Sequence, residues 1–126
     1  MSGPAVVKAL SGVVLDSVEP PALARFYAEL LGWEIAVEDA TWVILKGPGD
    51  GTHLSFQLEP ELQRPRWPST RADQQMMIHL DFLVEDLAAA VGKVTELGGT
   101  LADHQPQEHV RVCADPEGHV FCLFLE

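Results

Sequence analysis

The sequence predicts an α+β domain made of two tandem βαβββ modules within 126 residues. One reason is the order of the expected elements, because one strand, one helix and then three strands occur twice along the chain. A second reason is repetition. The pair Leu15-Asp16 recurs 65 residues later as Leu80-Asp81, and Leu31-Gly32 recurs 66 residues later. A repeat of this length is one βαβββ unit used twice, so residues 1–126 are expected to form one domain.

The first module, expected at about residues 8–60, begins with a short buried strand at residues 13–16. A helix is expected next, since the two prolines at 20–21 are tolerated in a first turn, where a missing N–H costs nothing. The apolar side chains that follow are spaced as one stripe of an amphipathic helix: Leu23, Phe26, Tyr27, Leu30 and Leu31. Gly32 is expected to cap the end of this helix.

Three strands complete the first module, because β-rich runs or polar-apolar alternation occur at residues 33–37, 41–45 and 53–58. A connector is expected at about residues 61–75, where there is little periodicity. Trp67 within the connector needs a surface to pack against.

The second module, expected at about residues 76–126, repeats this order. A strand is predicted at residues 76–84, and Glu85 and Asp86 then stand where carboxylates favour a helix N-terminus. The helical stripe is Leu87, Ala90, Val91, Val94 and Leu97. The remaining strands are expected at residues 100–102, 109–114 and 119–125, with a turn at 115–118.

The charge limits the partners of the protein. Nineteen Asp and Glu against eight Lys and Arg give a formal net charge of -11. A surface this negative repels nucleic acid and anionic membranes, since both bind proteins largely through Lys and Arg. A neutral or cationic small molecule remains possible, and the charge can also serve solubility alone.

The sequence also indicates a cytoplasmic protein. No apolar run approaches the ~20 residues that cross a bilayer. Residues 1–10 contain one Lys and no long apolar stretch, so no signal peptide is expected. The two cysteines, Cys113 and Cys122, fit reduced, buried thiols.

Four stretches, residues 22–33, 54–57, 79–82 and 115–123, resemble the vicinal oxygen chelate superfamily. This superfamily holds glyoxalase I, bleomycin resistance proteins, extradiol dioxygenases and epimerases, and the chain looks most like its bacterial glyoxalase-like domain branch. The resemblance covers nearly the whole chain. It implies strands curled into an open, U-shaped β-barrel around a ligand cleft, with helices outside, and it leaves the function open.

Strand alternation then assigns side chains to the two faces of each sheet, and a register error of one residue would invert an assignment. The side chains expected to face the cleft are His53, Ser55, Gln57, Met77, His79, Asp81, Leu83, His109, Arg111, Cys113, Val120, Cys122 and Phe124. The side chains expected to pack outward are Leu54, Phe56, Leu58, Ile78, Leu80, Phe82, Val84, Val110, Val112, Phe121 and Leu123.

The resemblance also bears on metal binding. Metal-dependent members place four ligands on four cleft strands, typically His, Glu or Gln, His and Glu. The first position falls on residues 12–14, which cannot bind metal, and the second falls on Ser55 or Gln57. The third is His79, and the fourth is Cys122 in place of a carboxylate.

This donor set is poor for a hard octahedral ion, although a His–Cys pair with further ligands suits zinc. No cofactor is therefore predicted and a divalent metal is disfavoured, with His79 and Gln57 the expected ligands if an ion binds. Asp81 and His53 would add to a site only if the strands bring them close.

Other residues bear on ligand binding. Asp81 is expected on the same face as His79, where a carboxylate raises an imidazole pKa and fixes its orientation. Arg111 could pair Asp81 or bind a substrate carboxylate. Trp42 and Trp67 could stack on a flat cation or serve only packing. His119, which follows a turn, is interpreted as structural.

Two functions follow. The first is a metal-independent, bleomycin-resistance-like protein that binds a small molecule through these residues: His53, Ser55, Gln57, Trp42, Trp67, His79, Arg111 and Cys122. The second is a lyase or isomerase on a small oxygenated substrate, with His79 as general base oriented by Asp81. A purely structural or partner-binding dimer is a third function. The resemblance implies a homodimer, because members often pair modules across subunits.

Overall fold

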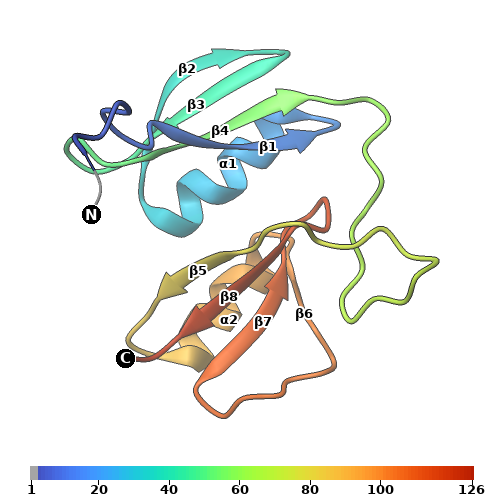
Figure 1. The fold of residues 1–126 in the computed structure, drawn as a ribbon. Helices are drawn as coiled ribbons and strands as arrows, with labels where there is room; N and C mark the ends of the chain where they lie inside the picture. The colour runs from blue at the N-terminus through green and yellow to red at the C-terminus, as the bar shows by residue number, and fades with distance from the viewer. Residues whose placement is uncertain (1–2) are drawn as a thin grey trace.

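The computed structural model describes residues 3–126 and contains two βαβββ modules in succession (Figure 1). The first module comprises β1 (Gly12–Ser17), α1 (Pro20–Leu31), β2 (Glu34–Asp39), β3 (Trp42–Lys46) and β4 (His53–Leu58). The second comprises β5 (Leu80–Leu83), α2 (Leu87–Glu96), β6 (Thr100–Leu101), β7 (Val110–Ala114) and β8 (Val120–Phe124). The predicted α+β class and the tandem module order are confirmed.

Each module folds its four strands into one mixed sheet. The strand orders are β1-β4-β3-β2 and β5-β8-β7-β6. The pairs β1–β4 and β5–β8 are parallel, whereas the other neighbours are antiparallel. The first strand of each module therefore lies beside the last one, which places Asp16 next to Gln57 and Asp81 next to Cys122.

Local signals set the helix ends as expected. Gly32 caps α1 with a φ of 70°, a left-handed conformation that favours glycine. Asp86 caps the start of α2, where its carboxylate accepts a hydrogen bond from the backbone N–H of Ala89 at 3.0 Å. Within residues 3–126, neither helix has the length and apolar character needed to cross a membrane.

One hydrophobic core spans both modules, and aromatic rings of α1 lie at its centre. The ring of Tyr27 stacks on Phe56 of the first sheet at 5.8 Å between centroids, and it lies 6.1 Å from Phe121 and 6.4 Å from Phe82 of the second sheet. The ring centroid of Phe26 also lies 6.2 Å from that of Phe121. In Figure 1, α1 accordingly lies between the first sheet and the second module.

The packing of the helices leaves one face of each sheet open. The helix-bearing faces of both sheets contribute to the shared core. On the opposite faces, Val14 and Val37 of the first sheet and Leu83 of the second are 46%, 44% and 54% exposed. The sheets therefore do not close into a barrel, and the cleft expected between them is replaced within one chain by two separate open faces.

Hydrogen bonds from the turn between β7 and β8 connect the second module to β1. Asp115 is fully buried, and its carboxylate accepts hydrogen bonds from the Tyr27 hydroxyl at 2.7 Å and from His119 Nδ1 at 2.8 Å. It also accepts hydrogen bonds from the backbone N–H groups of Glu117 and His119. His119 Nε2 donates to the backbone carbonyl of Asp16 at 2.8 Å. These contacts confirm the structural role predicted for His119.

The orientation predicted for β7 and the packing predicted for Ile78 were wrong. In β7, Cys113 pairs with Phe121 and is buried in the core, so this side of the strand faces the helices. Val112, opposite Cys122, lies on the other face of the sheet, away from the helices against which it was expected to pack. The prediction was inverted because both sides of β7 carry apolar side chains. Ile78 precedes β5, which starts only at Leu80, and is 61% exposed and not packed outward as predicted.

Candidate functional site

Three predicted site residues meet on the open face of the second sheet. Asp81 of β5 and Cys122 of β8 are direct register partners, and His79 lies just before β5. His79 Nε2 lies 3.1 Å from Asp81 Oδ1. The possible metal-ligating atoms of all three residues lie within 4.8 Å of one another. Strand alternation therefore placed this cluster on one face as expected.

The three residues of this cluster line a cavity of about 310 Å³. Besides the cluster it is lined by Gln107, His109, Val110, Phe124 and Leu125. His109 was expected to face a cleft but was not counted as a site residue. Gln107 lies in the loop before β7, where no sequence pattern marks it. The cavity thus combines polar groups from the cluster with the apolar side chains at the ends of β7 and β8.

The electrostatics of the cluster favour a protonated thiol. Burial raises the pKa of Cys122, and the charge of Asp81 and a hydrogen bond to it raise the pKa further. Since the thiolate is the reactive form of cysteine, Cys122 is not set up as a nucleophile near neutral pH. Asp81 Oδ1 lies 3.1 Å from His79 Nε2, so Nδ1 is the ring nitrogen that this contact leaves free.

The site residues predicted in the first module lie on the first sheet, whereas the His79 cluster lies on the second. Gln57 Nε2 donates to Asp16 Oδ1 at 2.9 Å, and Trp42 is the register partner of Gln57. Ser55 is buried in the same strand. His53 Nδ1 accepts the backbone N–H of residue 47 at 3.1 Å and holds the loop between β3 and β4. These residues are not brought together with His79 within one chain.

Trp67 and Arg111 also lie away from the cluster. The Trp67 ring stacks on His104 at 5.5 Å and lines a cavity of about 210 Å³ with Val112 and Val120. Arg111 lies on the helix side of β7, and its guanidinium donates to the carbonyls of residues 107, 108 and 110. The predicted orientation of Arg111 toward the cleft was therefore wrong.

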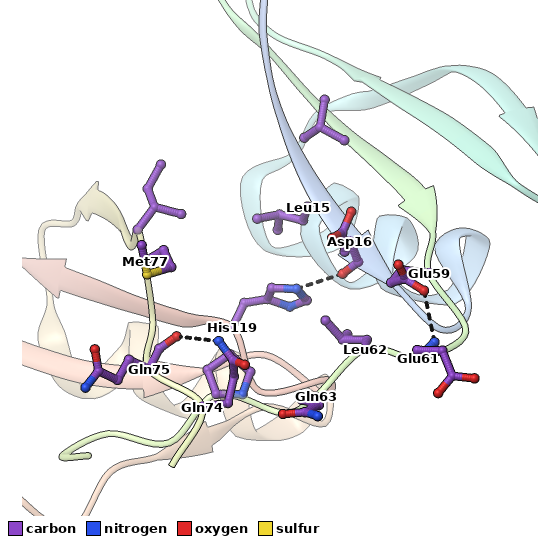
Figure 2. A pocket seen from close by; sticks show the side chains of 13 residues that line it. Leu15, Asp16, Glu59, Glu61, Leu62, Gln63, Gln74, Gln75, Met77 and His119 are labelled. Carbon is purple, nitrogen blue, oxygen red and sulfur yellow. Dashed lines mark hydrogen bonds between the residues drawn. The ribbon is translucent and has the colours of Figure 1, made fainter. Parts of the chain in front are cut away.

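A larger cavity of about 500 Å³ lies where β1, the connector and the segment before β5 meet, as Figure 2 shows. Glutamines, exposed carboxylates and apolar side chains line it. His119 is its only imidazole among the lining residues, and both ring nitrogens already have partners in Asp115 and the Asp16 carbonyl. None of the lining residues therefore offers a free imidazole, and we place the candidate site at the cluster of His79, Asp81 and Cys122.

The family model of the glyoxalase-like domain matches residues 12–124 of the chain. The chain belongs to the glyoxalase-like domain family. This places it in the vicinal oxygen chelate superfamily that the sequence resembles. No curated protein matches this glyoxalase-like domain.

Solved structures share the fold. A glyoxalase-related enzyme from Fulvimarina pelagi is 20% identical, with a TM-score of 0.70 over 95% of this chain and 89% of that chain. A glyoxalase/bleomycin resistance protein/dioxygenase family enzyme from Burkholderia phytofirmans PsJN is 17% identical, with a TM-score of 0.69 over 92% of this chain and 97% of that chain. Oxidase ChaP-H2 is 21% identical, with a TM-score of 0.67 over 97% of this chain and 95% of that chain.

Within residues 3–126, one chain of the glyoxalase-like domain does not bring together the four ligand positions of its metal-dependent relatives. Val14, on the open face of β1, offers no ligand atom, and Gln57 lies on the other sheet with its side chain bonded to Asp16. His79 and Cys122 nevertheless stand together, and Asp81 joins them with a carboxylate. This nitrogen, oxygen and sulfur set fits the ligand types of zinc better than those of magnesium or manganese.

Proposed function

We propose that this glyoxalase-like domain binds a neutral or cationic small molecule in the cavity above His79, Asp81 and Cys122, without the four-ligand metal set. The observation that carries the proposal is the convergence of these three polar side chains at the mouth of a cavity of about 310 Å³. Ligand sites typically combine a few convergent polar groups with apolar walls, which Val110 and Phe124 supply here.

The charge of the site favours the stated class of ligand. The Asp81 carboxylate lines the cavity, whereas the Arg111 guanidinium is engaged by backbone carbonyls on the other side of the sheet. An anionic substrate would thus meet a carboxylate without a lining lysine or arginine to balance it. The overall charge of -11 acts in the same direction.

We further propose that the protein works as a homodimer. The open face of the first sheet carries Asp16 and Gln57 at the positions that Asp81 and Cys122 occupy on the second sheet, 65 residues later. A second copy could set its first-sheet face over the His79 cluster of its partner and supply Gln57 and Trp42 to the ligand. Light scattering on the eluting protein should give twice the chain mass, and a monomer mass would refute this arrangement.

A thermal-shift screen with planar cationic compounds tests the binding proposal. A ligand that binds only the folded state stabilises it by about 2.7 kcal/mol at 100 times its Kd, so hits should raise the melting temperature. Asp81→Asn should remove the shift. Asp103→Asn, an exposed carboxylate outside the cavity, should keep it. If no compound of this class shifts melting, or if Asp81→Asn responds as the native chain does, the proposal is wrong.

The contact between His79 and Asp81 supports a second function, a lyase or isomerase acting on a small oxygenated substrate. In this function His79 is the general base and Asp81, 3.1 Å away, orients its ring. For any substrate found, His79→Ala should abolish turnover with an unchanged melting temperature. His104→Ala, which alters an imidazole outside the cavity, should retain it. Undiminished turnover by His79→Ala would exclude this role.

A cytoplasmic location is also part of the proposal, and the two free thiols of Cys113 and Cys122 support it, because reducing compartments preserve such groups.

A further inference from the structure

We infer that the cavity between the connector and the second sheet binds a small planar aromatic carboxylate, which two arginines and a tryptophan of the connector recognise. This connector cavity measures about 210 Å³ and is lined by Arg64, Arg66 and Trp67, among others. It shares no lining residue with the cavity at the His79 cluster. The inference therefore goes beyond the proposed function and does not rest on it.

The charge of the connector cavity is opposite to that of the chain. Its charged lining residues, Arg64 and Arg66, are both cationic, and no carboxylate from residues 3–126 lines it. By contrast, Asp81 lines the cavity at the His79 cluster, and three carboxylates line the cavity of Figure 2. Residues 62–72 contain three of the eight Lys and Arg of the chain and no Asp or Glu. A chain with a net charge of -11 thus offers an anion a locally cationic pocket.

Both arginines have N–H groups to offer a ligand. Arg64 donates through Nη1 to the Pro116 carbonyl at 2.9 Å, and its side chain lies so close to residue 118 that a Cβ there would collide with it. These contacts hold the guanidinium in place, and the other N–H groups of its fork match the two oxygens of a carboxylate. Arg66 Nε lies 3.7 Å from Asp73 Oδ1, too far for a hydrogen bond. Since this pair is exposed and weak, a ligand carboxylate can replace Asp73 as the partner of Arg66.

The apolar lining favours an aromatic ring. The Trp67 indole lines the cavity, and its stacking on His104 at 5.5 Å between centroids holds it in place. Val112 and Val120 also line the cavity, and both are only 6% exposed although they share a sheet face with Cys122. The connector therefore covers this end of the face. A flat ring bound there gains stacking and apolar burial that a simple inorganic anion does not.

The size of the cavity limits the ligand. Ligand pockets typically measure about 300–1,000 Å³, and the connector cavity is smaller than this range. It therefore suits one ring with one acid group, as in benzoate, with the carboxylate at the two arginines and the ring beside Trp67.

Titration of the untagged full chain with benzoate, followed by the NMR signal of the Trp67 indole N–H, tests the inference. Trp67→Phe identifies this signal among those of the three tryptophans. We expect saturable shifts with a Kd on the order of 1 mM, because so small a ligand makes few contacts. Added NaCl should weaken the binding. Benzamide, a neutral analogue of the same shape, should bind at least about tenfold more weakly, since it lacks charge-assisted hydrogen bonds.

Arg64→Gln and Arg66→Gln should each weaken benzoate binding about fivefold or more. Arg71→Gln is the matched control, because it removes an exposed arginine of the same connector that does not line the cavity, and it should bind benzoate as the native chain does. The side chain of Arg66 is 73% exposed, so Arg66→Gln keeps the test decisive if Arg64→Gln, which loses a contact to the turn, fails to fold.

Three results would overturn the inference. The first is the absence of saturable Trp67 shifts at about ten times the expected Kd. The second is equal affinity for benzamide and benzoate, or equal affinity of Arg66→Gln and Arg71→Gln for benzoate. The third is a saturable shift of the His79 ring signal without one at Trp67, which would place benzoate at the His79 cluster.

Discussion

Replacement of His119 by alanine should destabilise the protein more than any exposed substitution, because this ring joins the two modules. Its Nδ1 lies 2.8 Å from the buried Asp115 carboxylate, and its Nε2 lies 2.8 Å from the backbone carbonyl of Asp16. Asp115 also accepts the Tyr27 hydroxyl and two backbone N–H groups, so its oxygens act as acceptors throughout. Both ring nitrogens of His119 must then donate, which makes the ring an imidazolium.

The size of the effect follows from these contacts. Removing one partner of a buried ion pair costs about 3–5 kcal/mol, since the other charge stays buried without compensation. His119 is 14% exposed and Asp115 is fully buried, so solvent screens this pair little. For a domain of this size, one kcal/mol corresponds to roughly 3–5 °C in melting temperature. His119→Ala should therefore melt about 10–20 °C lower.

The effect should also depend on pH. Burial alone lowers the pKa of His119, but the hydrogen bond to Asp115 and its charge, with smaller contributions from the Asp16 carbonyl and Glu117, raise it above its ordinary value. A pKa raised in the folded state contributes stability that is fully present below the unfolded value of about 6.5. That stability is lost as the pH rises through the folded pKa.

Urea unfolding of the native chain and His119→Ala, at pH 6 and at alkaline pH, measures both effects. The difference in free energy of unfolding should be largest at pH 6 and should shrink as the pH rises. His109→Ala, at an exposed position, is the control. A loss below about 1 kcal/mol at pH 6, or a difference that does not shrink with pH, would refute an imidazolium link between the modules.

Three further substitutions or treatments test other parts of the structure. Gly99→Ala should cost about 1–3 kcal/mol in urea unfolding, because a Cβ there would lie 2.7 Å from Val94 Cγ1 and 2.8 Å from the Ala114 carbonyl oxygen. Gly92→Ala, with open space around the new Cβ, should stabilise α2. Equal changes in the free energy of unfolding for the two variants would contradict this packing. Asp86→Ala should cost about 1 kcal/mol by removing the N-cap of α2, whereas Glu85→Ala should cost little. A thiol reagent should modify Cys122 first, because burial raises the pKa of Cys113 to about 11 and shields it; equal rates in the folded protein would contradict this.

The elements of the fold were predictable because their signals are local. Pro20 and Gly32 set the ends of α1, and the repeated Leu-Asp pairs revealed the duplication before any contact was known. The packing of the modules was not predictable in the same way. The apolar stripe of α1 contains Phe26 and Tyr27, and nothing in its spacing says that these rings also contact the second sheet.

The candidate site was predictable in part for the same reason. His79, Asp81 and Cys122 converge because alternation along β5 and β8 is unambiguous, with Phe121 and Leu123 clearly on the buried side. Arg111 was misplaced because β7 has apolar side chains on both faces, so its orientation depends on the neighbouring strand. The stacking of Trp67 on His104 joins two loops, for which periodicity carries no information.

The most direct test of the binding site is a histidine ring NMR titration with a compound that raises the melting temperature. The ring signals of His79 and His109, which line the cavity, should shift in a saturable way, while those of His104 and His119 should stay constant. Saturable shifts at His119 without shifts at His79 would place the ligand in the cavity of Figure 2 and contradict a site on the open face of the second sheet.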